Sequence, residues 1–211
     1  MSKIEEIFTA IETGKAKIIA ELVQSAIDEG VDPMEILNHG MVDAMTLIGE
    51  RFSRGEAFVP EMLISARTMK KGVEVLKPHL AKDATTSFST AVIGTVQGDM
   101  HDIGKNLVAM MIESAGFEVV DLEVDVPLER FVEAIQTHPN VRIVALSTLL
   151  TTTMPAMKRI VAGLNELENR STFRVMVGGA PITEEFARSI GADGYSPDAA
   201  AAAALAKSLA G

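Results

Sequence analysis

The sequence of 211 residues has no cysteine, no cluster of lysine and arginine, and no long apolar run. Without cysteine the chain cannot form disulfides, thiolate metal sites, iron–sulfur ligation or a cysteine nucleophile. Nineteen basic residues against 29 acidic ones leave a net charge of −10, which argues against nucleic acid or an anionic membrane as the main partner. No stretch approaches the roughly 20 apolar residues that span a bilayer, and the N-terminal segment lacks the apolar core of a signal peptide. We therefore expect a cytoplasmic protein with no membrane partner.

Residues 1 to about 80 show only helical periodicity. In the first segment Ile4, Ile7 and Ile11 recur at spacings of three and four, and Gly14 follows at its end. The periodic segments are 3–14, 15–30, 32–55 and 58–80. Amphipathic helices with short connections predict a four-helix bundle as an N-terminal domain, residues 1–85. Residues 81–90 lose the periodicity and are predicted to form a linker.

From residue 90 onward, short apolar runs rich in β-branched residues alternate with helical stretches. The predicted strands are 90–96, 117–124, 142–148 and 173–179, and the predicted helices are 104–116, 127–138, 154–169, 182–191 and 196–211. Apolar runs of this kind are typical of buried parallel strands. Their alternation with helices predicts an α/β domain over residues 86–211, built on a five-stranded, doubly wound, flavodoxin-like parallel sheet. In the last helix we predict Ser196 as the N-cap and Pro197 in the first turn.

A histidine lies between two aspartates in the stretch QGDMHDIG, residues 97–104, which follows the first predicted strand. Ligands of doubly wound sheets bind at the carboxyl ends of the strands, so His101 lies where chemistry is usually placed. The same residues also suit an ordinary surface turn, in which Asp99 and Asp102 are turn and capping residues.

Three other kinds of site fit this stretch poorly. A phosphate loop needs a glycine pattern that the stretch lacks, and its acidic residues would repel phosphate. A hydrolytic zinc site needs three ligands, which Asp99, His101 and Asp102 are too close together in sequence to provide. A phosphoacceptor receiver domain needs an aspartate where the third strand ends in Ser147. The remaining interpretation is an imidazole offered to a metal that other groups already hold, with Asp99 bonded to its far nitrogen and Gly104 leaving room for a bulky ligand.

Three motifs occur in order, each where a predicted strand ends. They are Asp99-Met100-His101-Asp102-Ile103-Gly104, Ser147-Thr148-Leu149 and Gly178-Gly179. The ordered set D-x-H-x-x-G, S-x-L and G-G resembles the signature of cobalamin-binding domains. Residues 56–80 resemble the helical cap that precedes this domain in cobalamin-dependent methionine synthase and in the small corrinoid proteins of methanogens and acetogens. Because the resemblance covers nearly the whole chain, the sequence is identified as similar to the stand-alone corrinoid proteins of methyltransferase systems.

The resemblance implies a cobalamin cofactor bound base-off/His-on, with His101 as the lower axial ligand of cobalt and Asp99 hydrogen-bonded to the imidazole. Gly104 would admit the displaced nucleotide tail of the cofactor, and Gly178 and Gly179 would let the backbone approach it. The other residues expected to bind the cofactor are Asp102, Ile103, Ser147, Leu149, Thr151 and Thr153, with Phe58 and Met62 as cap residues over the opposite face of the corrin.

The resemblance also implies a methyl carrier rather than an enzyme acting alone. In such systems cobalt(I) accepts a methyl group from a substrate-specific methyltransferase. Methylcobalt(III) then passes it to a second methyltransferase acting on tetrahydrofolate or coenzyme M, and a reductive activator is a further expected partner. The helical domain is expected to be a lid that swings on the linker 81–90.

Two other functions stay open, a cobalamin-dependent sensor or regulatory module and the cobalamin subunit of an adenosylcobalamin mutase. The methyl donor is open between methanol, a methylamine, a betaine and a methoxyarene.

Overall fold

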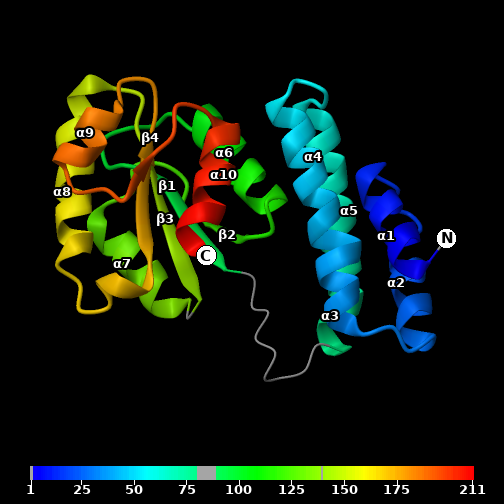
Figure 1. Cartoon of the computed structure of the whole chain (residues 1–211). Coiled ribbons are helices and arrows are strands. Elements are labelled where there is room, and N and C mark those ends of the chain that lie inside the picture. The colour runs from blue at the N-terminus through cyan, green and yellow to red at the C-terminus, as the bar shows by residue number, and fades with distance from the viewer. Residues whose placement is uncertain (1, 80–88, 139) are drawn as a thin grey trace. The chain divides into compact units, whose positions relative to one another are not determined.

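The computed structural model describes residues 2–79, 89–138 and 140–211, and the chain divides into two compact units (Figure 1). The N-terminal unit is helical, and the C-terminal unit is α/β. Residues 81–88 of the predicted linker, and the predicted domain boundary between residues 85 and 86, lie outside the described residues. The hinge and the boundary therefore stay predictions. Thr90, the last residue of the predicted linker, already begins the first strand.

The helical unit contains the predicted helices, in the part of the chain that is described. Its elements are α1 (Lys3–Glu12), α2 (Ile19–Asp28), α3 (Pro33–Glu35), the π-helix η1 (Ile36–Val42), α4 (Asp43–Ser53), α5 (Val59–Leu76) and the short 3-10 helix η2 (Lys77–His79). Helix α1 begins at a reciprocal cap, because the Ser2 hydroxyl accepts from the Glu5 amide while the Glu5 carboxylate accepts from the Ser2 amide. Asp32 caps α3 in a similar way, with Pro33 in the first turn.

The third predicted helix, 32–55, is not a regular α-helix along its whole length. Its middle part, η1, is π-helical and connects α3 to α4. η1 buries Ile36, Leu37, Gly40 and Met41 and packs against α1. A Cβ on Gly40 would lie 3.1 Å from a methyl carbon of Ile7, so the absence of a side chain there allows this close approach. The wider helical turn is thus associated with tight packing rather than with an irregular sequence pattern.

The α/β unit confirms the predicted doubly wound fold. Its elements are β1 (Thr90–Thr95), α6 (Ile103–Ser114), β2 (Glu118–Asp121), α7 (Leu128–Thr137), β3 (Val141–Ser147), η3 (Thr151–Thr153), α8 (Met154–Asn165), η4 (Arg170–Thr172), β4 (Arg174–Gly178), α9 (Glu184–Ser189), β5 (Gly194–Tyr195) and α10 (Ala199–Ala210). The described strands form one parallel sheet in the order β2-β1-β3-β4-β5. Strand order reverses between β1 and β3, which is where ligands bind in folds of this kind.

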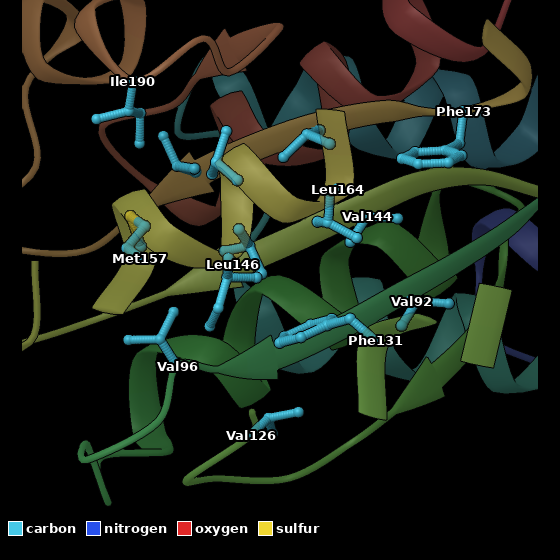
Figure 2. Close-up of a cluster of buried hydrophobic side chains, with 14 of the residues drawn as sticks. Val92, Val96, Val126, Phe131, Val144, Leu146, Met157, Leu164, Phe173 and Ile190 are labelled. Atoms are coloured by element: carbon cyan, nitrogen blue, oxygen red, sulfur yellow. The ribbon is translucent and has the colours of Figure 1, made fainter. Parts of the chain in front are cut away.

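One face of the sheet packs against α7 and α8. Figure 2 shows Phe131 of α7 and Met157 and Leu164 of α8 among strand residues that include Val92 and Val144. These side chains are buried and belong to one apolar cluster. Helices α6 and α10 lie on the opposite face of the sheet (Figure 1). Burial on both faces explains why the central strands read as continuous apolar runs in the sequence.

The last helix begins later than predicted. Its N-cap is Asp198, whose carboxylate accepts from the Ala201 amide at 2.8 Å, and the predicted cap Ser196 is wrong. The Ser196 amide still bonds to the carbonyl of Val177 in β4, at 3.4 Å. Because Ser196 continues the pairing of β5 with β4, helix α10 can start only after Ser196.

None of the helices in the described ranges combines the length and the apolar character needed to cross a membrane.

Candidate functional site

The histidine loop, residues 97–102, connects β1 to α6 and is fixed by backbone contacts. The Thr95 hydroxyl donates to the carbonyl of His101 at 2.8 Å, and the Asp99 amide donates to the carbonyl of Val96 at 3.1 Å. The His101 side chain is half exposed, whereas Asp99 is fully buried. The loop thus presents an accessible imidazole on a buried carboxylate.

Asp99 accepts hydrogen bonds from its own loop after β1 and from the loop after β3. Its Oδ1 accepts from the His101 ring nitrogen Nδ1 at 2.6 Å and from the His101 amide at 3.1 Å. Its Oδ2 accepts from the Thr148 hydroxyl at 2.8 Å, the Leu149 amide at 2.7 Å and the Thr153 hydroxyl at 3.2 Å. The loops after β1 and β3 are therefore joined through one carboxylate.

These contacts keep the carboxyl group of Asp99 ionised. Burial by itself raises the pKa of Asp99, but the hydrogen bonds from Leu149, His101 and Thr148 together outweigh it and hold the pKa well below its usual range. Asp99 is therefore a carboxylate at neutral pH and can only accept. The proton of the bond therefore lies on His101 Nδ1, so Nε2 is the ring nitrogen that is available to a ligand.

A cavity of about 560 Å³ lies beside His101, at the carboxyl ends of β1, β3 and β4. Eight of the predicted site residues line it: His101, Asp102, Ile103, Gly104, Ser147, Leu149, Gly178 and Gly179. Apolar side chains such as Ile93, Leu107 and Met176 make up much of the remaining wall. The three sequence motifs are thus brought together around one space, as their order along the strands implied.

Other predicted residues lie elsewhere. Thr153 is buried and bonds to Asp99, and Thr151 is exposed in η3; neither is among the residues that line the cavity. Phe58 and Met62 belong to the helical unit, where Phe58 is 67% exposed and Met62 is 3% exposed. A cofactor-binding role stays a prediction for these four residues, as it does for those that line the cavity.

The motif glycines differ in what requires them. A Cβ on Gly179 would collide with the carbonyl of Thr148, and its φ of +124° is a conformation that side chains disfavour. At Gly104 a Cβ would meet no heavy atom within 4 Å. Gly179 is therefore needed for the protein's own packing, whereas Gly104 leaves free space beside the cavity.

Sequence reasoning missed several residues of this region, among them Thr148, Ser196 and Lys105. Thr148 is the middle position of the S-x-L motif, and its hydroxyl bonds to Asp99. Ser196, 7% exposed, lines the cavity although we expected it to cap a helix. Lys105, 2% exposed, also lines the cavity and forms an ion pair with Asp121 at 2.6 Å. Of these three residues, only Thr148 could have been recognised in the sequence, because it is the last residue of a predicted strand and belongs to the S-x-L motif.

Comparison with known proteins agrees with this geometry. Residues 89–204 match the B12 binding domain family, and residues 3–77 match a second B12 binding domain family. A corrinoid protein of Desulfitobacterium hafniense is 39% identical over 214 aligned residues, which cover 100% of this chain and 99% of the relative. Trimethylamine corrinoid protein 1 of Methanosarcina acetivorans is 42% identical over 206 aligned residues, which cover 94% of each protein.

A solved structure extends the similarity to the fold. The methanol:cobalamin methyltransferase complex MtaBC from Methanosarcina barkeri matches with a TM-score of 0.82 and 30% sequence identity, over 99% of this chain and 79% of that chain. The resemblance found in the sequence is thereby confirmed. The chain belongs to the family of B12-binding corrinoid proteins, and its cofactor is cobalamin.

Proposed function

We propose that this protein is a methyl carrier that binds cobalamin base-off, with His101 as the lower ligand of cobalt. The single observation that carries the proposal is the half-exposed imidazole of His101, whose Nδ1 is bonded to the buried carboxylate of Asp99 at 2.6 Å. The bound corrinoid supplies a cobalt centre that accepts a methyl group and later releases it. The chain supplies the ligand, its orientation and the space around it.

The cavity suits the nucleotide tail that leaves the cobalt in this binding mode. Residues at three strand ends line it, and much of its wall is apolar, as a flat aromatic base requires. Gly104 leaves open space at its edge. Ser147 and Ser196 add hydroxyl groups to the wall, which can bond to polar atoms of the tail. We therefore assign Asp102, Ile103, Gly104, Ser147, Leu149, Gly178 and Gly179 to this subsite.

Asp99 keeps the imidazole oriented. Because hydrogen bonds stabilise Asp99 strongly as a carboxylate, it does not take the Nδ1 proton from His101, and the ring stays in the tautomer that offers Nε2. The hydroxyl groups of Thr148 and Thr153 hold the far oxygen of the carboxylate in place. A carboxylate fixed in this way raises the basicity of the imidazole.

The partners follow from the relatives. Curated relatives include trimethylamine and dimethylamine corrinoid proteins, each at least 40% identical, and the MtaBC structure contains a methanol:cobalamin methyltransferase. We take a methylated amine as the first candidate for the methyl donor, delivered by a separate substrate:corrinoid methyltransferase. The acceptor side would be a corrinoid methyltransferase for tetrahydrofolate or coenzyme M, and a reductive activator would restore oxidised cobalt.

Paramagnetic resonance of the cobalt(II) form tests the ligand. In the wild type we expect nitrogen hyperfine splitting from a protein histidine, and in His101→Ala we expect its loss with some corrinoid still bound. His39→Ala is the matched control, because His39 is also an exposed histidine bonded to a carboxylate, Asp43, at 3.0 Å. Absence of the splitting in the wild type would contradict the proposed binding mode.

Methyl transfer tests the carrier role. The reduced, cobalamin-loaded protein is mixed with a methylamine methyltransferase of a related system and with trimethylamine, dimethylamine, monomethylamine or methanol in turn. We expect alkylation of the cobalt, followed by absorbance, with one of the amines. Alkylation by methanol alone, with its own methyltransferase, would reject the amine assignment.

A further inference from the structure

The connection between β2 and α7 lies against the histidine loop. We call residues 121–126, which are the last residue of β2 and most of this connection, the bracing loop. Within it, the Asp125 carboxylate accepts from the Gly98 amide at 2.7 Å, and the Asp125 amide donates to the carbonyl of Asp99 at 3.0 Å. Both bonds act on backbone groups at or next to Asp99, the residue that holds the imidazole of His101. The start of the histidine loop is thus fixed from outside.

Asp121, the first residue of the bracing loop, binds the start of α6, which follows the histidine loop. Asp121 accepts from the Lys105 ammonium through both carboxylate oxygens, at 2.6 and 2.7 Å. Lys105 lies directly after Gly104, in the first turn of α6, and also donates to Asn106 at 2.6 Å. Its ammonium group is almost fully buried, so loss of the carboxylate would leave a buried charge poorly compensated.

The bracing loop has an unusual backbone between these two carboxylates. Glu123 has a φ of 70° and Asp125 a φ of 55°, in the left-handed region that residues other than glycine seldom adopt. Hydrogen bonds hold Glu123 in this conformation: its amide donates to Asp121 at 2.8 Å, and its carbonyl accepts from the Thr95 amide at 3.0 Å. A conformation of this kind persists only where its surroundings require it.

We propose that Asp125 and Asp121 are positioning residues that fix the histidine loop at both ends and so keep His101 on the cobalt. A ligand on a freely moving loop must lose conformational entropy when it binds the metal, whereas a loop already held in place does not. This inference rests on the proposed function, because it concerns how firmly His101 ligates cobalt. It adds two residues that belong to none of the three sequence motifs.

The test measures the ratio of His-on to His-off cobalt(II) in the full-length, cobalamin-loaded protein by paramagnetic resonance. Asp125→Ala should lower this ratio about tenfold, as expected for loss of one hydrogen bond to a charged group. Asp125→Asn should restore most of it, because the amide oxygen still accepts from Gly98 and asparagine tolerates a left-handed φ. Glu129→Ala, an exposed acidic residue in the first turn of α7, is the matched control and should leave the ratio unchanged.

A second variant and a second measurement distinguish the positioning role from a general loss of structure. Asp121→Asn keeps an acceptor for Lys105 but removes the charge, and should lower the ratio by a smaller factor in the same direction. Hydrogen exchange of the cofactor-free protein should become faster at residues 99–105 in Asp125→Ala and stay slow in Glu129→Ala.

A wild-type ratio in both Asp125→Ala and Asp121→Asn, with the wild type itself His-on, would overturn the positioning role alone. A wild type that shows no histidine splitting would overturn the proposed function and this inference with it.

Discussion

The two units contain a similar pair of side chains in very different surroundings. In the helical unit, His39 bonds to Asp43 at 3.0 Å, and both side chains are exposed. In the α/β unit, His101 bonds to Asp99 at 2.6 Å, and Asp99 is fully buried with further hydrogen bonds from the loop after β3. An exposed histidine–carboxylate pair is weak and mobile. The comparison teaches that burial and additional donors to the carboxylate, rather than the pair alone, hold an imidazole in one orientation.

The units also differ in whether their predicted site residues lie inside regular helices and strands or at their ends. In the helical unit Met62 belongs to the periodic stripe of α5 and is buried, so its packing is explained without a ligand. In the α/β unit the residues that line the cavity lie largely where the strands end and the pattern stops. Residues in loops at strand ends do not have to fill the hydrophobic core. They can therefore be chosen for binding or catalysis.

The largest effect is expected from a comparison of two glycines in the α/β unit. Gly179→Ala should destabilise the cofactor-free protein by about 3 kcal/mol or more, because the new Cβ collides with backbone and the φ is disfavoured. Gly104→Ala should stay within about 1 kcal/mol of the wild type, since its Cβ meets open space. Urea unfolding without cofactor measures both. Equal stability of the two variants would mean that the motif glycines share one role.

The next effect separates the two histidine–carboxylate pairs. Asp99→Ala should cost about 2–4 kcal/mol, because it leaves buried donors without a partner, whereas Asp43→Ala should cost at most about 0.5 kcal/mol. The pKa of Asp99 is lowered on folding, so its contribution is present above the ordinary value of 3.8 and declines as the pH falls below it. When the free energy of unfolding is measured from pH 7 to pH 3, the difference between the wild type and Asp99→Asn should therefore become smaller toward pH 3. A difference that grows with acidity would contradict the assignment.

A smaller effect concerns the helical unit by itself. Met62→Ala should lower the free energy of unfolding by about 2–3 kcal/mol, since the side chain is buried in the bundle. Phe58→Ala should change it by no more than about 0.5 kcal/mol, because Phe58 is mostly exposed. Both are measured by thermal unfolding of the cofactor-free protein. If Phe58→Ala proves as damaging as Met62→Ala, the contrast between the exposed N-cap residue of α5 and the buried residue within it is wrong.

Much of the fold could be predicted because its pattern is local. Helical periodicity located α1, α2 and α5, and apolar runs located β1, β3 and β4 within a few residues. The π-helical η1 and the two-residue β5 could not be located, because neither has a periodic signal of its own. Ser196 and Asp198 are equally good N-caps, and the pairing of Ser196 with β4 decides between them.

The site could be predicted as far as its motifs reach. His101, Gly104 and Leu149 follow strand ends, and their position in a doubly wound fold brings them together. Contacts made across long stretches of chain gave no signal. Asp121 pairs with Lys105, and Asp125 bonds to Gly98, only because the loop after β2 folds back on the histidine loop.

The central claim is that the α/β unit contains the complete lower ligand site, including every described residue that lines the cavity. The most direct measurement is the paramagnetic resonance of cobalt(II) in residues 87–211 alone, compared with the full-length protein. The fragment keeps the whole apolar cluster of Figure 2 and should fold without the helical unit. We predict the same histidine nitrogen splitting in both proteins and its loss when His101 is replaced by alanine in either. A fragment that is folded and loaded with cobalamin but lacks the splitting would contradict the account.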